Sequence, residues 1–576
     1  MDILPLYPLQ NVKSSGHPGA EDLYQRRMPP STVVDFNTFF SSFYESYWRA
    51  YTRVRTLFFS FTIQGAGTLK LYRQVEAMAA VSIFEARYAG EKERVQVRVP
   101  DPQEADGGRV FAIFEPEESS YSITEAAWET DQPPALEVGL AAVVCTFNRE
   151  DDVCNLVEKF AQASGVVEVI IVNHGEKGLS NRLAPRLSAY ARSLPTTFCD
   201  QDNLGGSGGF SRGMYAAQQH GKASHILLCD DDIAIDPDII TRIAAVLRYS
   251  DGRLALGGMM LDRFKPTWLH NNVTTFRDDL FKVVTPLPNV DLAESMALAP
   301  LSVADTADMN GWWCYAFPCS YLQKTGFALP FFLHYDDGEF GLRLGELGCR
   351  TVSWPGIAVW HEPFYAKQQS VRRYYDFRNV LFLFRGHKRL HRLACLRQFT
   401  WRFAINLVQY QYDSAWSILQ AMADYLAGPS LLAAWSAEDH RSLLTRAQAW
   451  GEEPLPCASC PEKSPVSPFV PQKESGALAR RILSDLVRPV TELTPPCVEP
   501  TAWHIWGATG YDAYAFYFDK EKILQIYRRS PVRALRLGCR FVGLFVAFAC
   551  GWDYRWRVSD LTKLSSLDFW RQKWLL

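Results

Sequence analysis

Hydrophobic and polar residues alternate in short runs over the first quarter of the chain, from Thr32 to about Thr130. Alternation of this kind, with glycines between the runs, is typical of antiparallel strands that bury one face. We therefore predict an N-terminal antiparallel β-sandwich in residues 1–135, after an irregular start that ends near residue 30. Aromatic residues gather in Phe36–Phe40 and at Tyr47–Trp48; they could form the core of this domain or a surface that contacts carbohydrate. The clearest alternating runs are 56–63, 67–72, 95–99 and 109–114.

After a linker-like segment at 131–136 the pattern changes, and continuous apolar runs alternate with amphipathic ones. Strands separated by helices pair in parallel through right-handed crossovers. The pattern therefore predicts a central, Rossmann-like α/β domain in residues 136–385. Parallel sheets bind ligands beyond the carboxyl ends of their strands, which makes the motifs at those ends the candidates for function. The predicted strands are 138–146, 166–173 and a run that ends at Asp230, and the predicted helices are 151–163, 183–193 and 211–220.

The remaining residues, 386–576, are predicted to be mostly α-helical. A stretch rich in proline and serine, 451–472, predicts a linker or a disordered loop within them. Further on, a cluster of arginines from Arg528 to Arg540 precedes an apolar run that ends at Trp552 and several more tryptophans. Basic residues beside apolar, Trp-rich stretches suit a region that rests on anionic lipid. The alternative is an ordinary helical hairpin that packs on the α/β domain.

Composition sets limits on the class of protein. A chain of 576 residues with 48% hydrophobic residues can hold two to four domains with large cores. A net charge of −3 gives no argument for nucleic-acid binding. The 13 cysteines are scattered, as in a reducing compartment, and the single Cys457-x-x-Cys460 does not favour a zinc site. The start shows no secretory signal, and the apolar run 541–552 is shorter than the roughly 20 residues that span a bilayer. We expect a cytoplasmic protein, peripheral on the inner face of the membrane.

The most informative segment is the glycine-rich stretch NLGGSGGFSR at 203–212. Glycines leave backbone N–H groups open to an anion, and the N-terminus of the helix that follows favours negative charge. Although such a stretch can also be only a turn, its position before a strand that ends in three aspartates points to a sugar nucleotide. Arg149, at the end of the first α/β strand, could hold a phosphate or ribose oxygen. The predicted donor-binding residues of the stretch are Asn203, Gly205, Gly206, Ser207, Gly208, Gly209 and Arg212.

The three aspartates are the candidate metal site. Side chains alternate along an extended segment, so Asp230 and Asp232 lie on the same side and Asp231 points elsewhere, toward the donor or a backbone group. Paired carboxylates suit a hard divalent cation that also takes phosphate oxygens as ligands. His361, at the end of an apolar run, could complete an Asp/Asp/His set that suits Mn2+ or Mg2+. The alternative for His361 is a structural role at the end of a buried strand.

Two further motifs supply candidate catalytic and acceptor-binding residues. Asp336 and Asp337 precede a predicted helix, and a sugar hydroxyl needs a general base within hydrogen-bond reach. We choose Asp337 as the base and Asp336 as the residue that orients the acceptor, although an acid here could only cap the helix. Trp312 and Trp313 offer aromatic planes for the acceptor sugar, or else belong to the core.

These motifs occur in a familiar order: TFNR, NLGGSGGFSRGM, a strand into DDDI, NGWW, YDDGEFGLR and AVWH. The chain resembles the polymerising galactofuranosyltransferases of mycobacterial cell-wall galactan, which belong to the inverting glycosyltransferase family 2 and have a GT-A fold. The resemblance implies UDP-galactofuranose as donor, a glycan or glycolipid acceptor and Mn2+ or Mg2+ as cofactor. It implies metal binding by Asp230, Asp232 and His361 and base catalysis by Asp337. It also implies C-terminal helices that associate with membrane, and a homo-oligomer, up to a tetramer.

The chain departs from the family pattern in two places. Where family 2 enzymes commonly set an aspartate against the uracil, this chain has Asn173, whose amide oxygen could accept from the base instead. Residues 262–308, which should help to shape the acceptor pocket, do not match closely, so acceptor and linkage do not follow from the resemblance.

Three other functions stay open. The first is a transferase of the same fold for rhamnose or a hexopyranose, from UDP or dTDP. The second is a carbohydrate-binding protein with a degenerate site. The third is a nucleotidyltransferase, which would leave the Asp336–Asp337 loop and the two tryptophans unexplained.

Overall fold

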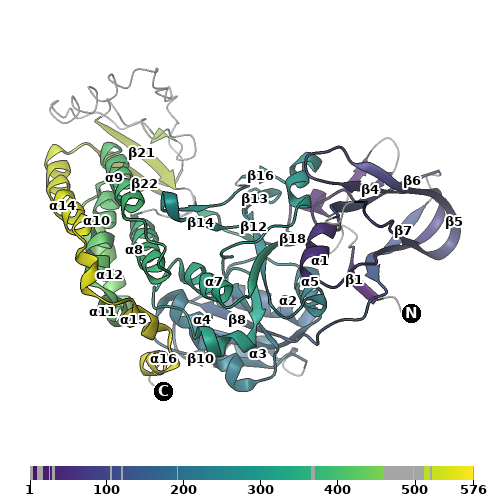
Figure 1. Cartoon of the computed structure of the whole chain (residues 1–576), viewed down its shortest axis with the longest axis horizontal. Coiled ribbons are helices and arrows are strands. Elements are labelled where there is room, and N and C mark those ends of the chain that lie inside the picture. The colour runs from purple at the N-terminus through teal and green to yellow at the C-terminus, as the bar shows by residue number, and fades with distance from the viewer. Residues whose placement is uncertain are drawn as a thin grey trace.

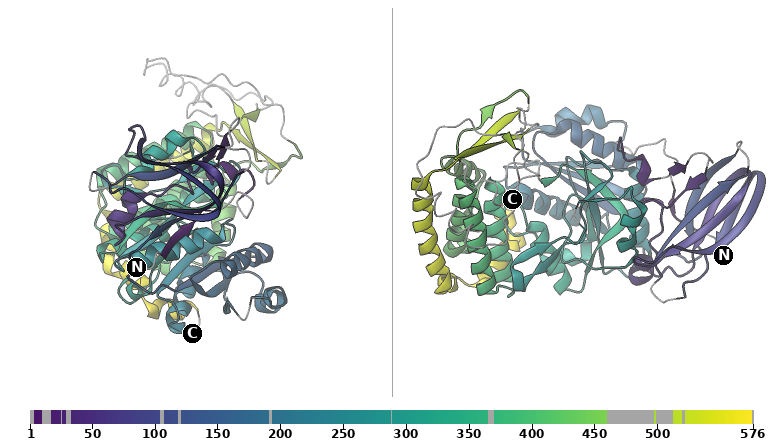
Figure 2. Two further views of the ribbon diagram at one scale, coloured as in Figure 1. Left: turned by 90° about the vertical axis from the view of Figure 1, so that its right-hand side faces the viewer. Right: turned by 90° about the horizontal axis from the view of Figure 1, so that it is seen from above.

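The protein consists of three parts in a row, a sheet-rich N-terminal part, a central α/β part and a helical C-terminal part (Figure 1). The view from above shows the same order (Figure 2). The computed structural model describes residues 4–9, 17–24, 26–28, 33–103, 107–117, 121–190, 193–287, 289–364, 370–459, 497–498, 512–518 and 522–574. Cys460 and most of the proline- and serine-rich stretch lie outside these residues.

The N-terminal strands form one antiparallel sheet of seven strands. β4, which is 17 residues long, pairs with β5 along its whole length on one side and first with β7 and then with β6 on the other. The sheet therefore forks at β4, because this long strand pairs with two successive neighbours on the same side. The predicted antiparallel, sheet-rich N-terminal region is confirmed, and its description as a sandwich stays a prediction. The strands are β1 (Leu4–Pro8), β2 (Arg26–Met28), β3 (Val33–Asp35), β4 (Phe58–Gln74), β5 (Val81–Arg98), β6 (Arg109–Pro116) and β7 (Ser122–Thr130).

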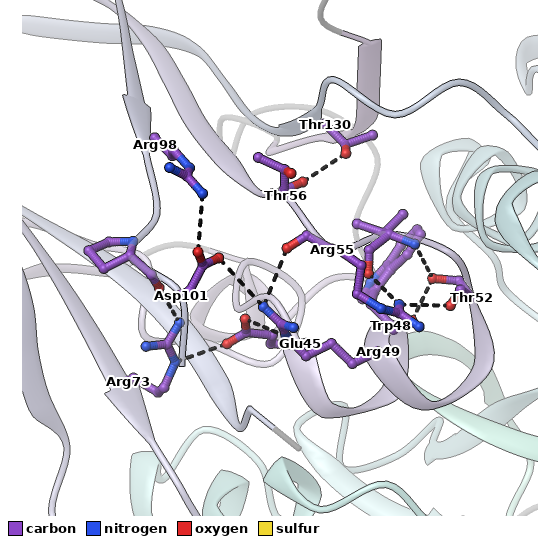
Figure 3. A network of polar contacts seen from close by, with 12 residues as sticks. Glu45, Trp48, Arg49, Thr52, Arg55, Thr56, Arg73, Arg98, Asp101 and Thr130 are labelled. Atoms are coloured by element: carbon purple, nitrogen blue, oxygen red, sulfur yellow. Dashed lines mark hydrogen bonds and ion pairs between the residues drawn. The ribbon is translucent and has the colours of Figure 1, made fainter. Parts of the chain in front are cut away.

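A short helix, α1 (Glu45–Tyr51), follows β3 in the chain and packs between this sheet and the central part (Figure 1). Glu45 is buried and accepts hydrogen bonds from Arg49 of α1 and Arg73 of β4, both at 2.9 Å (Figure 3). Trp48 stacks edge-on against Trp354 of the central part, with 5.6 Å between ring centroids. The aromatic clusters singled out above are buried, so they are core and not a carbohydrate surface.

The central sheet has the strand order β10-β9-β8-β11-β17-β12-β13-β16, with β18 paired to β12. β10, β9, β8 and β11 are parallel, as predicted, and β17 runs antiparallel between β11 and β12. The strands are β8 (Leu140–Thr146), β9 (Val166–Asn173), β10 (Thr196–Asp200), β11 (His225–Asp230), β12 (Leu254–Asp262), β13 (Trp268–Asn271), β16 (Val290–Asp291), β17 (Tyr315–Pro318) and β18 (Arg350–His361); a hairpin of β14 (Thr275–Arg277) and β15 (Lys282–Val284) stands beside the sheet.

Helices cover both faces of this sheet. α2 and α5 share one hydrophobic core with the N-terminal part, while α4 and α7 pack on the other face. The predicted helix 183–193 starts earlier and ends earlier than expected. The helices are α2 (Glu150–Gln162), α3 (Leu179–Leu187), α4 (Gly205–His220), α5 (Pro237–Tyr249), α6 (Leu322–Thr325) and α7 (Asp336–Glu346).

The C-terminal part is mostly helical, as predicted, but it also contains a small sheet of four strands that the sequence did not suggest. Its last helix returns to the central part: Trp570 is 1% exposed and donates from Nε1 to the carbonyl of Ala328 at 2.9 Å. Trp556 and Trp574 are also buried, so these tryptophans support the packing alternative and do not face lipid. The elements are α8 (Ser370–Gly386), α9 (Arg392–Val408), α10 (Tyr412–Ala427), α11 (Pro429–Ala434), α12 (Ala437–Gln448), β19 (Leu455–Pro456), β20 (Cys497–Val498), β21 (Ala513–Phe518), β22 (Ile523–Arg528), α14 (Pro531–Ala549), α15 (Val558–Thr562) and α16 (Leu567–Lys573).

Candidate active site

Two strand ends bring together the residues predicted to bind metal. β11 ends at Asp230 and β18 ends at His361. The Nε2 atom of His361 lies 3.1 Å from Oδ1 of Asp232 and 3.6 Å from Oδ2 of Asp230. One possible ligand atom from each of the three residues lies within 4.8 Å of the others, the only such group in the part of the chain that the structure describes. Two carboxylates and an imidazole are a fitting donor set for a divalent cation such as Mn2+ or Mg2+.

Arg149 lies against these acids. Its Nη1 atom is 2.9 Å from Oδ2 of Asp232, and its Nε atom is 3.9 Å from Oδ1 of Asp231. Burial raises the pKa of Asp231 to about 7, against the lowering effects of Thr146 and of the Arg149 charge. Arg149 thus compensates part of the negative charge of the cluster, and a phosphate that it bound would compete with Asp231 and Asp232 for its guanidinium group.

The glycine-rich stretch is not a loop. Helix α4 begins at Gly205, six residues before the predicted start, and includes the motif from Gly205 to Arg212. A Cβ atom on Gly205, whose φ is +68°, would lie 2.0 Å from the carbonyl oxygen of Phe332, and one on Gly209 would lie 2.1 Å from Sγ of Cys145. The glycines therefore allow α4 to start against the loop before α7 and to pack closely on β8.

Only part of the predicted donor-binding set faces the site. Gly206, in the first turn of α4, lines the pocket together with the three aspartates. Asn203 instead accepts the N–H of Gly205 at 2.9 Å and shapes the start of the helix. Ser207 is buried beneath Asp336 and lowers the pKa of that residue. Gly208 is also buried, with no place for a side chain beside Leu204.

Asn173 and Arg212 lie away from the pocket wall. The buried amide of Asn173 accepts from the N–H of Gly175 at 2.9 Å and donates to Asp200 at 2.7 Å, so it orders the loop after β9. The guanidinium of Arg212 lies over the ring of Trp574, 5.4 Å from its centroid. Binding of the donor by these two side chains stays a prediction.

The site is a pocket of about 350 Å³. Its walls come from the ends of β11 and β18, the first turn of α4, the loop before α7 and helix α8. Trp312 and Trp313 contribute to it but are only 4% and 7% exposed, and Trp313 donates from Nε1 to the carbonyl of Gly258 at 2.9 Å. They are core residues with an edge in the wall. Asn271 and Thr274 also line the pocket, so part of the 262–308 segment does shape it, as expected.

Asp336 and Asp337 are the first residues of helix α7 and line the same pocket as Asp230, Asp232 and His361. Burial raises the pKa of Asp336 to about 6. Burial, and then the charge of Asp336, raise the pKa of Asp337 well above that of an ordinary carboxyl group. A carboxylate with a raised pKa is a stronger base, which is what the abstraction of a hydroxyl proton needs.

Three pocket residues with a charged or imidazole side chain were missed in the sequence: His334, Arg372 and Asp376. Arg372 and Asp376 lie four residues apart on α8, with an Nε to Oδ2 distance of 3.4 Å. An arginine and an aspartate four residues apart in a helix rich in aromatic residues are the sequence signal that could have indicated these pocket residues. The same spacing is found in ordinary ion pairs on helix surfaces.

Known proteins share both the N-terminal and the central part. The family described as "Galactofuranosyltransferase 2 N-terminal" matches residues 1–131, and "Glycosyltransferase like family 2" matches residues 137–377. The galactofuranosyltransferase GlfT2 of Mycolicibacterium smegmatis is 29% identical over 461 residues, which are 75% of this chain and 70% of that protein. GlfT2 of Mycobacterium tuberculosis is 27% identical over 454 residues, 74% of this chain and 70% of that protein. A solved mannosyltransferase from Pyrobaculum calidifontis, in complex with GDP-Man and Mn2+, aligns at a TM-score of 0.32 and 13% identity over 55% of this chain and 84% of that chain.

Proposed function

Since this chain is a glycosyltransferase, with a family 2-like domain behind a galactofuranosyltransferase 2 N-terminal region, we propose that it transfers galactofuranose from UDP-galactofuranose to a glycan or glycolipid acceptor of the cell envelope. The observation that carries the proposal is the shared pocket: the Asp230/Asp232/His361 cluster and the Asp336–Asp337 pair line one cavity. A cation site and a general base in one pocket are the two requirements of metal-assisted transfer to a hydroxyl group.

In the proposed mechanism the acceptor hydroxyl attacks the anomeric carbon while the bond to the nucleotide diphosphate breaks, with inversion. Asp337 takes the proton of the hydroxyl, and Asp336 orients the acceptor. The N-terminus of α4, at Gly206, places the positive end of the helix dipole beside the diphosphate. Asp230, Asp232 and His361 would hold Mn2+ or Mg2+, which neutralises charge on the leaving group when bound. Arg149, already beside Asp232, is placed to add a positive charge on the same side.

A panel of nucleotide sugars tests the donor. Purified protein is incubated with UDP-galactofuranose, UDP-galactopyranose, UDP-glucose and dTDP-rhamnose, each with a short galactofuranoside acceptor, and the products are read by mass spectrometry. We expect extension by one or more hexose units with UDP-galactofuranose and Mn2+ or Mg2+, at a rate at least about tenfold above any other donor. Chelation of the metal should abolish the extension. Faster transfer from a pyranose or rhamnose donor would overturn the choice of sugar, and no metal-dependent turnover of any donor would favour a binding protein.

We also propose that the C-terminal part binds the cytoplasmic face of the membrane. Within the described residues there is no helix long and apolar enough to cross a bilayer. Helix α14 nevertheless presents a row of exposed apolar side chains at helical spacing, namely Val532, Leu535, Val542 and Val546, which are 52–70% exposed. Such a stripe on an otherwise folded protein suits insertion into the headgroup region.

The twelve cysteines of the described residues are all free thiols, which agrees with a reducing compartment.

Two of the five arginines between Arg528 and Arg540 contribute less to membrane binding than the sequence suggested. Arg529 is buried and pairs with Asp512 at 2.9 Å, and Arg533 pairs with Glu452 at 2.8 Å. The apolar stripe should therefore dominate membrane binding, with weak dependence on salt. The oligomeric state, up to a tetramer, stays a prediction.

Vesicle binding tests the stripe. Replacing Leu535 and Val542 together by glutamate should weaken binding to vesicles with 30% anionic lipid by more than about tenfold, because two apolar contacts are lost and two charges are added. Co-sedimentation measures the bound fraction, while activity on a short soluble acceptor should be unchanged. Val81→Glu, at a 63% exposed position of β5, is the matched control. Equal vesicle binding by the double variant and the control would remove α14 as the contact.

A further inference from the structure

The loop before the candidate base has an unusual backbone. Phe332, His334 and Tyr335 have φ values of 72°, 63° and 65°, in the left-handed region that residues other than glycine rarely adopt. Such a backbone conformation is unfavourable for residues other than glycine and persists only where the surroundings hold the loop in place. Strain of this kind is concentrated at ligand sites.

Helix α8 holds this loop through buried side chains. Arg378 donates from Nη2 to the carbonyl of Phe331 at 2.6 Å. Asn379 donates from Nδ2 to the carbonyls of Leu333 and His334, both at 2.7 Å. Arg378 and Asn379 are both 0% exposed, so these bonds are shielded from water. The position of the loop, and of the acids that follow it, is therefore set by α8.

The same helix orients one side chain in the pocket. Nδ1 of His334 lies 2.9 Å from Oδ1 of Asp376, and Nε of Arg372 lies 3.4 Å from the other oxygen of that carboxylate. All three residues line the pocket. Although burial alone would raise it, the pKa of Asp376 is held below the ordinary value by His334 and Arg372. An ionised Asp376 accepts a hydrogen bond from the N–H at Nδ1 of His334. The Nε2 atom on the other side of the ring is then left for another hydrogen-bond partner.

We infer that His334 binds a hydroxyl group of the acceptor sugar through Nε2, with Asp376 as the positioning residue that fixes its ring; this inference rests on the proposed function. His334 is two residues before Asp336 and three before the candidate base, so a group bound to it lies on the acceptor side. At this wall Asp376 compensates the positive charge of Arg372 and contacts the ring of His334, so the wall has little net charge to attract the diphosphate of the donor. An uncharged, polyhydroxylated ligand matches this wall of the pocket.

Two amide substitutions test the two ring nitrogens of His334 separately. In His334→Asn the amide reaches only the position of Nδ1, so the contact with Asp376 can persist while the Nε2 group is lost. Asparagine also tolerates the φ of 63°. We expect this variant to raise the KM for the acceptor about tenfold, with kcat within about threefold and the affinity for UDP unchanged, as for loss of one well-aligned hydrogen bond. His334→Gln, whose amide reaches the depth of Nε2, should recover part of that loss.

A histidine outside the pocket provides the control. His387 follows α8 and contacts Glu346 with a distance of 2.7 Å from Nδ1 to Oε1, much as His334 contacts Asp376. His387→Asn should leave the acceptor KM unchanged, and Asp376→Asn should raise it in the same direction as His334→Asn. An acceptor KM for His334→Asn within twofold of the wild type, with thermal unfolding unchanged, overturns the inference. Wild-type protein that transfers no galactofuranose at all would instead overturn the proposed function, and the two failures are thus distinct.

Discussion

Replacing Asp232 by alanine should reduce transfer from the nucleotide sugar by at least about 10²–10³-fold, the scale for loss of a group that stabilises charge in the transition state. Asp232 is the centre of the cluster. One of its oxygens lies 3.1 Å from Nε2 of His361, and the other lies 2.9 Å from Nη1 of Arg149. The substitution therefore removes a predicted metal ligand and the partner of the nearest arginine together. Steady-state rates over a range of Mn2+ concentrations, and Mn2+ binding followed by electron paramagnetic resonance, measure the two effects separately.

Asp251→Ala is the control for this experiment. Asp251 pairs with Arg253 and Arg350, each at 2.9 Å, so it is also an ion-paired aspartate of the central part, but it does not line the pocket. Its loss should cost little activity, because partly exposed ion pairs contribute about 0–1 kcal/mol. If Asp232→Ala binds Mn2+ as tightly as the wild type, the cluster is not the metal site, whatever the activity does.

The central sheet and the candidate metal cluster could be predicted because parallel sheets impose simple rules. Apolar runs without alternation mark strands buried on both faces, and their carboxyl ends meet at one edge. Asp230 and His361 are far apart in the chain, but each follows such a run, and the structure places both at that edge. The three residues of the cluster are confirmed as neighbours, and their roles stay predictions.

The glycine-rich motif was misread for a physical reason. Glycine is among the poorest helix formers, so local propensity places the start of α4 after the glycines. In the structure the start is decided by tertiary contacts instead: a side chain at Gly205, Gly209 or Gly213 would collide with Phe332, Cys145 or Val143. Close packing between elements distant in sequence cannot be read from a single chain.

The role of α8 was hidden for a related reason. Its polar residues Asp376, Arg378 and Asn379 occur among aromatic ones, and a helical pattern does not reveal which face meets which loop. The structure shows that these residues bond to the backbone of the loop before α7 and to the side chain of His334 in it. The fork in the N-terminal sheet could not be predicted from the sequence either. The alternation of hydrophobic and polar residues along β4 is the same whether this strand has one neighbouring strand on each side or two on one side.

Replacing Asp337 by asparagine should lower kcat by about 10²–10⁴-fold, the contribution of a general base, while the affinity for UDP stays within about twofold. The amide keeps the shape of the side chain and can still accept the N–H of Gly338, which lies 2.7 Å from Oδ1 in the wild type. Only the ability to take a proton is lost. Single-turnover rates and calorimetric titration with UDP measure the two quantities, and turnover near that of the wild type would contradict the assignment.

The pH profile gives an independent test of the same residue. Burial, followed by the charge of Asp336, raises the pKa of Asp337, so the base is protonated at a higher pH than an ordinary carboxyl group and the rate should fall early as the pH decreases. Asp336→Asn removes a like charge and therefore lowers the pKa of Asp337. In the residual activity of that variant, the acidic limb of kcat/KM should move to lower pH. Loss of the acidic limb together with nearly all activity would mean that Asp336, and not Asp337, is the group that titrates, and the roles of the two acids would be exchanged.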